Sequence, residues 1–150
     1  MTHQKQSSGV TPQDRLDHLL SAGQDPFARF QQLIALLRSE NGCPWDQKQT
    51  PATLKKYLLA ETRELAEAID QGDHDHICEE IGDLFYILLM LCQMFKEQGL
   101  FTADTALEAI TRKMIRRHPH VFAGKPAGSE EELRRQWEAI KKEEKKRGQR

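Results

Sequence analysis

Two pairs of acidic residues are the side chains of this 150-residue sequence best placed to do chemistry. Glu61 and Glu64 lie in the segment ETRE, and Glu80 and Asp83 lie in EIGD. Residues three apart share one face of a helix, so each pair directs two carboxylates the same way. Four carboxylates brought together repel one another unless they are protonated, paired with bases or bound to cations. Anionic ligands that offer only oxygen favour Mg²⁺, which Mn²⁺ can replace.

The position of each pair on its helix decides between a metal site and an ordinary charged surface. Glutamates are common in helices, and salt bridges to neighbouring Lys and Arg residues would explain either pair alone. Glu61, however, falls on an apolar stripe between Tyr57 and Leu65, and Glu80 falls on the stripe of the following helix. Two pairs of carboxylates at positions where core residues are expected favour the metal site.

Helical periodicity predicts the elements that carry these residues. The apolar spacing indicates an all-α bundle of about four to five helices, over residues 26–42, 53–69, 75–98 and 103–118 and from residue 129 onward. The short turn at 71–73 makes the second and third helices antiparallel neighbours, so their carboxylate pairs face each other. Residues 41–50 and 118–128 are predicted to be loops. Thr102 is a predicted N-cap, and Ser129 with Glu132 is the signature of a capping box.

The domain organisation is predicted from composition and length. Residues 1–25 are a polar extension, expected to be mobile with at most a short helix at 14–20, and residues 147–150 are a polar tail. Residues 26–146 form one domain. Because the stretch 84–92 is apolar at every position, we expect that helix to be covered on all sides. A chain this small hardly surrounds one helix by itself, which favours a dimer or larger assembly.

Composition excludes several classes of function. With 22 basic and 23 acidic residues, the chain lacks the basic excess typical of nucleic-acid binding. No apolar run approaches the roughly 20 residues that span a bilayer, so we expect a cytoplasmic protein without a membrane partner. Cys43, Cys78 and Cys92 are odd in number and widely spaced, which is typical of reduced thiols. His118 and His120 are expected to cap a loop and not to bind metal.

A metal site built from carboxylates suggests a phosphorylated substrate, and the sequence contains matching cations. Lys113 and Arg117 lie one turn apart, and Lys141 follows Trp137 by one turn. These cations could clamp phosphates while the indole stacks on a base, although each alone is as readily explained as surface or core. Trp45, an aromatic residue in a polar loop, is either packed down or used for binding.

Five segments together resemble the MazG family of all-α nucleotide pyrophosphohydrolases. In chain order over about residues 27–145 they are ENGCPWDQKQT, ETRE, EEIGDLFYILL, RRHPHVF and RQWEAIKKEE. The resemblance implies a dimer or higher oligomer. It also implies hydrolysis of a nucleoside triphosphate between the α- and β-phosphates, giving a monophosphate and pyrophosphate. Longer members of the family carry two such modules, whereas this sequence has one and a polar extension.

The resemblance also assigns roles to individual residues. It implies that Mg²⁺ is held by Glu61, Glu64, Glu80 and Asp83, and that the substrate is contacted by Lys113, Arg117, Trp137 and Lys141. Glu64 is the candidate that orients the attacking water as a base.

Two alternative functions stay open at the level of sequence. One is a house-cleaning pyrophosphohydrolase that is specific for a single deoxynucleotide or damaged nucleotide. The other is a non-catalytic helical module whose carboxylates bind metal only structurally and whose third helix forms an interface. The cations Lys113, Arg117 and Lys141 discriminate between the classes, because a structural site would not need them.

Overall fold

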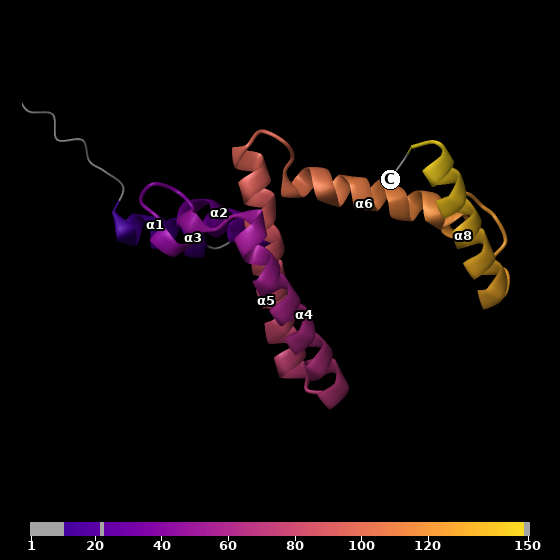
Figure 1. The fold of residues 1–150 in the computed structure, drawn as a ribbon, viewed down its shortest axis with the longest axis horizontal. Coiled ribbons are helices and arrows are strands. Elements are labelled where there is room, and N and C mark those ends of the chain that lie inside the picture. Colours follow the sequence, from indigo (N-terminus) through magenta and orange to yellow (C-terminus); the bar gives the residue numbers. More distant parts are fainter. Residues whose placement is uncertain (1–10, 22, 149–150) are drawn as a thin grey trace, which may run out of the picture. The chain divides into compact units, whose positions relative to one another are not determined.

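The computed structural model describes residues 11–21 and 23–148, and over these ranges it contains helices and no strand. The helices are α1 Pro12–Leu20, α2 Pro26–Leu37, α3 Pro44–Lys48, α4 Pro51–Gln71, α5 His74–Glu97, α6 Ala103–Arg117, α7 Pro119–Phe122 and α8 Glu130–Lys146 (Figure 1). The chain divides into two compact units, a first unit that ends at Leu100 and a second that begins at Phe101. The predicted all-α class is confirmed.

Three of the long helices begin at capping boxes, as their sequences suggest. The hydroxyls of Thr50, Thr102 and Ser129 accept hydrogen bonds from backbone N–H groups at the starts of α4, α6 and α8. In each case the third helical residue bonds back to the cap. Such a cap stabilises a helix by about 1 kcal/mol, so local sequence fixes where these helices begin. The predicted caps at Thr102 and Ser129 are confirmed.

Helices α4 and α5 form an antiparallel hairpin along most of their length (Figure 1). Gly72 ends α4 with a φ of 70°, a left-handed conformation that glycine adopts without strain. Asp73 then caps α5, because its carboxylate accepts from the backbone N–H groups of Asp75 and His76. The tight turn confirms that the two helices are antiparallel neighbours, which brings their acidic pairs face to face.

The core of the first unit lies where α2 and α4 pack against α5. Its buried side chains are Ile34 from α2, Leu54 and Ala68 from α4, and Ile87, Leu89, Met90 and Met94 from α5. Full burial of a side chain of this size stabilises the fold by about 1.5–3 kcal/mol. The apolar contacts therefore hold the helices that carry the acidic residues.

The segment after α2 differs from its prediction. The helix ends at Leu37 and not near residue 42, and the predicted loop at 41–50 contains the short helix α3. The backbone N–H groups of Gly42 and Cys43 donate to the carbonyls of Ser39 and Leu37, both at 2.8 Å. A β-carbon on Gly42 would lie 2.2 Å from the Leu37 carbonyl oxygen, so this tight turn requires glycine.

Other boundaries also differ from prediction. The predicted loop at 118–128 contains the four-residue helix α7, and α8 continues to Lys146 through the run of charged residues. Within the predicted extension, α1 forms at Pro12–Leu20 and packs on α2. The expectation of mobility at residues 1–10 lies outside the described residues, and the domain boundaries at 26 and 146 stay predictions.

One face of α5 is exposed in the single chain, so the expected coverage on all sides depends on an assembly and stays a prediction. Phe85 is 47% exposed and Leu88 is 46% exposed, and Ile81 is also exposed. These three residues, at spacings of four and three, form what we call the α5 stripe. Phe85 also lines an apolar hollow of about 610 Å³, which continues over α1 and α2.

The second unit is held together by a different kind of contact. Helix α8 packs on α6, yet among the described residues from Phe101 onward only Ala103 and Glu144 are buried. A buried carboxylate therefore takes the place that a large apolar side chain usually has. Within the described part of the chain, no helix is long and apolar enough to cross a membrane.

Candidate functional site

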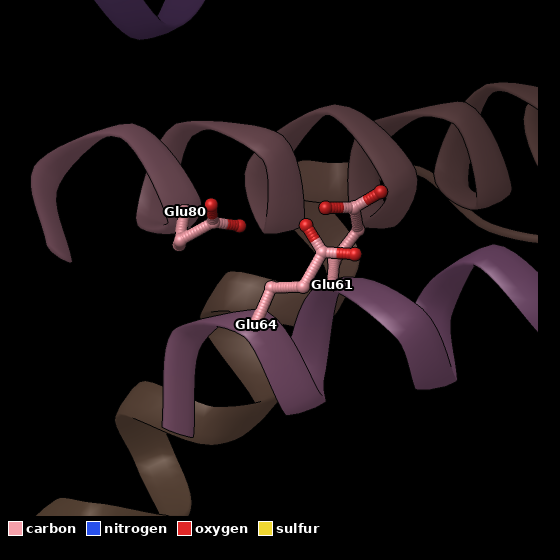
Figure 2. A group of neighbouring side chains, drawn as sticks. All are labelled: Glu61, Glu64 and Glu80. Atoms are coloured by element: carbon pink, nitrogen blue, oxygen red, sulfur yellow. The ribbon is translucent and has the colours of Figure 1, made fainter. Parts of the chain in front are cut away.

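Helices α4 and α5 bring three of the four predicted metal ligands into one cluster. Glu61, Glu64 and Glu80 each offer an oxygen within 4.8 Å of the others. Figure 2 shows that the two glutamates of α4 and the one of α5 direct their carboxylates into the space between the helices. The spacing of three along α4 and the antiparallel pairing of the helices account for this arrangement. We call these three residues the glutamate cluster.

Glu80 shows most clearly that the glutamate cluster suits a cation. Its side chain is buried, and its Oε1 lies 2.9 Å from Nε2 of His76. Its other oxygen, Oε2, is buried and has no hydrogen-bond partner among the described residues. A buried carboxylate oxygen without a partner is strongly unfavourable. A hard divalent ion that accepts oxygen ligands would satisfy it, so the residues present fit such an ion.

The negative charges around Glu61 also indicate a site for a cation. Partial burial raises the pKa of the Glu61 carboxyl, and the negative charges of Glu64, Asp83 and Glu80 raise it further. Asp83, the fourth predicted ligand, is exposed and lies outside the three-residue cluster, but its charge still acts on Glu61. The region therefore carries an excess of negative charge, which a cation would neutralise.

In the second unit, Arg117 is held by partners that the sequence reasoning missed. Its Nε and Nη2 donate to Oε2 of Glu144 at 3.1 and 2.8 Å, and Arg116 donates to Oε1 of the same carboxylate. The guanidinium also lies 5.0 Å from the centre of the Trp137 ring. Arg117 and Trp137, predicted as substrate contacts from two helices, are thus brought together.

The environment of Glu144 explains why it is stable as a buried anion. Hydrogen bonds from Arg117 lower the pKa of its carboxyl most, burial opposes them, and the positive charges of Arg117 and Arg116 lower it further. Two guanidiniums around one carboxylate leave a net positive charge at this point. The second unit can therefore still attract an anion such as a phosphate.

The two predicted lysines of the second unit differ in their surroundings. Lys113 is half-buried on α6, and its ammonium forms no ion pair with the described residues. Lys141 on α8 lies 3.2 Å from Glu138, which is exposed. Exposed pairs of this kind contribute little and exchange easily, so both ammonium groups are available to a ligand.

His118 supports the ring of Trp137 and caps a helix. Its Nδ1 lies 2.6 Å from the carbonyl oxygen of Met114, close to the end of α6, and its ring meets the Trp137 ring edge-on at 5.3 Å. Nδ1 of His120 lies 3.3 Å from Nε2 of Gln136. His118 thus caps the end of helix α6, whereas a loop cap was expected, and Trp137 lies between His118 and Arg117.

Trp45 is both packed and exposed, so both of its predicted roles stay open. Its ring meets the Tyr57 ring at 5.6 Å and 68°, and 44% of the residue is exposed. Tyr57 precedes Glu61 by one turn of α4, which places this pair of aromatic rings beside the glutamate cluster.

Helix α3, which carries Trp45, is anchored through the buried residue Asp46. The Tyr86 hydroxyl donates to the Asp46 carboxylate, and Nη1 of Arg38 donates to the Asp46 carbonyl at 2.6 Å. Burial raises the pKa of Tyr86, and the hydrogen bond to Asp46 raises it further. Arg38 also forms an ion pair with Glu97 at 2.7 Å, so one side chain ties α2, α3 and α5 together.

Comparison with known proteins identifies the family. Residues 49–122 match the family model described as the MazG nucleotide pyrophosphohydrolase domain. The chain is also similar to the crystal structure of a mazG-related protein from Thermotoga maritima, with 31% identity and a TM-score of 0.64. That similarity covers 77% of this chain and 98% of that one. The chain belongs to the MazG family.

Two named relatives extend the MazG comparison. The chain is 43% identical over 119 residues to the nucleoside triphosphate pyrophosphohydrolase/pyrophosphatase MazG of Thermotoga maritima, covering 77% of this chain and 45% of that protein. It is 46% identical over 105 residues to the nucleoside triphosphate pyrophosphohydrolase of Escherichia coli K12, covering 70% and 40%. The chain thus spans less than half of the length of these relatives.

The part that matches the MazG model includes both acidic pairs and two of the four predicted substrate contacts. Residues 49–122 contain the glutamate cluster, Asp83, Lys113 and Arg117, whereas Trp137 and Lys141 lie beyond them. The roles assigned to these residues from the sequence stay predictions.

Proposed function

We propose that this chain is a nucleoside triphosphate pyrophosphohydrolase that uses Mg²⁺ held by the glutamate cluster together with Asp83. The observation that carries the proposal is the buried Oε2 of Glu80, which has no partner among the described residues and belongs to a side chain that clusters with two further carboxylates. The names of the two relatives support the same reaction. Its products would be a nucleoside monophosphate and pyrophosphate.

The residues of the first unit would prepare the attack on the triphosphate. A bound divalent ion supplies positive charge to phosphate oxygens and lowers the pKa of the attacking water. Glu64 is the exposed member of the glutamate cluster, so its carboxylate can reach a water molecule and accept its proton. Buried Glu80 is not accessible in this way and serves as a ligand only.

The residues of the second unit would bind the substrate. Lys113, Arg117 and Lys141 would neutralise phosphate charge, and the planar guanidinium of Arg117 suits phosphate oxygens. Trp137 would offer its ring to the base. Because Glu144 and Trp137 already hold the Arg117 side chain, little conformational freedom is lost when a phosphate binds.

The test is hydrolysis of a panel of NTPs and dNTPs by the full chain, with Mg²⁺ or with EDTA, followed by chromatography of the nucleotide product. We expect monophosphate only with Mg²⁺, and a loss of at least about 100-fold in Glu80→Gln, which removes a ligand charge without changing shape. Glu67→Gln, which changes an exposed glutamate of α4 outside the cluster, is the control.

The other outcomes of this panel discriminate between the alternatives. Hydrolysis of one nucleotide alone would identify a narrowly specific enzyme. No hydrolysis of any nucleotide, or unchanged activity in Glu80→Gln, would refute the proposal. Metal binding without hydrolysis would then favour the non-catalytic module.

We also propose that the chain forms a homodimer or a larger homo-oligomer through the α5 stripe. Ile81, Phe85 and Leu88 leave an exposed apolar stripe on a helix whose residues 84–92 carry no charge. A second copy brings the same uncharged surface, as a two-fold interface requires. Light scattering should show a multiple of the 17.3 kDa chain mass, reduced in Leu88→Glu but not in Leu59→Glu. A monomeric wild-type chain would refute this proposal.

A further inference from the structure

Among the described residues, His76 is the one basic side chain in ion-pair contact with the buried carboxylate of Glu80. Its Nε2 lies 2.9 Å from Oε1 of Glu80, four residues later on α5. The side chain of His76 is 38% exposed and that of Glu80 is 6% exposed. The imidazole thus lies between solvent and the glutamate cluster, and it leaves the second oxygen, Oε2, without a partner.

We propose that His76 is a positioning residue, which holds Oε1 so that Oε2 faces the metal site; the inference rests on the proposed metal-dependent function. A glutamate side chain has three rotatable bonds, and Glu61 and Glu64 repel its charge. Without a donor at Oε1, nothing in the described contacts opposes rotation of the carboxylate away from them. A basic group held 2.9 Å from the far oxygen favours the orientation in which Oε2 is useful as a ligand.

The pair differs from an ordinary salt bridge on a helix surface. Exposed pairs four residues apart contribute little, because water competes for both partners. The side chain of Glu80 is only 6% exposed, so water competes for this pair less than it does for an exposed one. The geometry assigns the pair a role in the site and not only in the stability of the helix.

The ring of His76 can be replaced without changing the cap of α5. The backbone N–H of His76 donates to Oδ1 of Asp73 at 3.1 Å, and any residue at position 76 keeps that bond. Glutamine and methionine have similar lengths and similar helix propensities, but only glutamine carries a donor at its end. The variants His76→Gln and His76→Met therefore differ in whether a donor lies beside Oε1 of Glu80 and in little else.

The test is calorimetric titration of the metal-free full chain with Mn²⁺ at one pH. We expect His76→Met to raise the Kd by about tenfold, and His76→Gln to stay within about threefold of the wild type. His74→Met, an exposed histidine two residues earlier, is the matched control and should be unchanged. Circular dichroism checks that each variant keeps its helices.

The possible results separate this inference from the proposed function. Equal affinities of the Met and Gln variants would overturn the role of His76, whether both matched the wild type or both were weakened. If the wild-type chain bound no Mn²⁺, or if Glu80→Gln bound it as tightly as the wild type, the metal site itself would be refuted. A weakened Met variant beside a near-normal Gln variant would support the positioning role.

Discussion

Glu61 is the residue at which stability and metal binding should act against each other. Its carboxylate shares a 4.8 Å cluster with Glu64 and Glu80, and their charges together with burial raise its pKa. The substitution Glu61→Gln removes one charge and keeps the shape. We therefore expect the variant to be more stable than the wild type without metal and less stabilised by metal.

The size of the effect follows from the separation of the charges. Two unit charges 4.8 Å apart repel by about 0.9 kcal/mol in water and by about 3.5 kcal/mol at an effective dielectric constant of 20. Glu61 is half-buried and the unfolded chain retains little of this repulsion. A stabilisation of about 1–3 kcal/mol is expected, and 1 kcal/mol corresponds to about 4 °C in Tm for a chain of this length.

The stability difference between Glu61→Gln and the wild type should also depend on pH, in a direction that the raised pKa of Glu61 determines. Because the pKa of Glu61 is raised in the folded state, its protonated form stabilises the fold below the ordinary carboxyl pKa. That contribution is lost as the pH rises through the raised value. The advantage of Glu61→Gln should therefore be largest near neutral pH and shrink on acidification.

Thermal unfolding followed by circular dichroism, in EDTA and in Mg²⁺, measures both effects. Added Mg²⁺ should raise the Tm of the wild type in proportion to its binding, and should hardly change that of Glu61→Gln. Glu67→Gln should resemble the wild type in both buffers. A lower Tm for Glu61→Gln in EDTA, or an equal gain from Mg²⁺ in both proteins, would refute the reasoning.

Two further predictions concern the buried polar contacts. Glu144→Gln should lower the stability of the second unit near neutral pH, because the ionised Glu144 carboxylate, whose pKa is lowered in the folded state, stabilises the fold. The difference between the two proteins should vanish as the pH falls through this lowered pKa. Urea unfolding of the variant and the wild type over a range of pH measures it. Tyr86→Phe removes the donor to buried Asp46 and should destabilise the first unit by about 1–3 kcal/mol, with faster hydrogen exchange in α3; unchanged exchange would contradict this anchoring role.

The long helices and the glutamate cluster could be predicted because local rules specify them. Periodicity predicted five long helices, and the N-cap residues Thr102 and Ser129 predicted where two of them begin. The tight turn at Gly72 implied antiparallel helices, and residues three apart implied a shared face. These rules together placed Glu61, Glu64 and Glu80 in one group, without any long-range information.

The missed features depend on contacts between distant segments. Helix α3 has five residues, too few for a periodic pattern, and is held by Arg38 and Tyr86 from other helices. Glu144 lies in a charged run that looks like solvent-exposed surface, and only the packing of α8 on α6 shows that it is buried. His76 carried a local signal, its spacing of four from Glu80, but the burial that makes the pair matter is tertiary.

The α5 stripe shows a different limit of sequence reasoning. An apolar helix must be covered, but the pattern does not say whether its own chain or another copy covers it. Phe85 and Leu88 remain exposed in the single chain, and this observation supports the proposed oligomer.

The glutamate cluster is unfavourable by itself, so the remainder of the first unit must hold it in place. Ile87, Met90 and Met94 begin two turns beyond Glu80 on α5, and their burial fixes the helix pair regardless of the charge state of the cluster. The same packing prevents the carboxylates from moving apart, so their repulsion remains until a cation binds and relieves it. An ion that neutralises them would stabilise the fold by RT ln(1 + L/Kd), where L is the free ion concentration, so tighter binding gives a larger gain in stability at one ion concentration. Metal affinity and the stability gained on adding metal should therefore change together in every variant of the cluster. His76→Met tests this through a neighbour of the cluster, and Glu61→Gln tests it through one of the carboxylates.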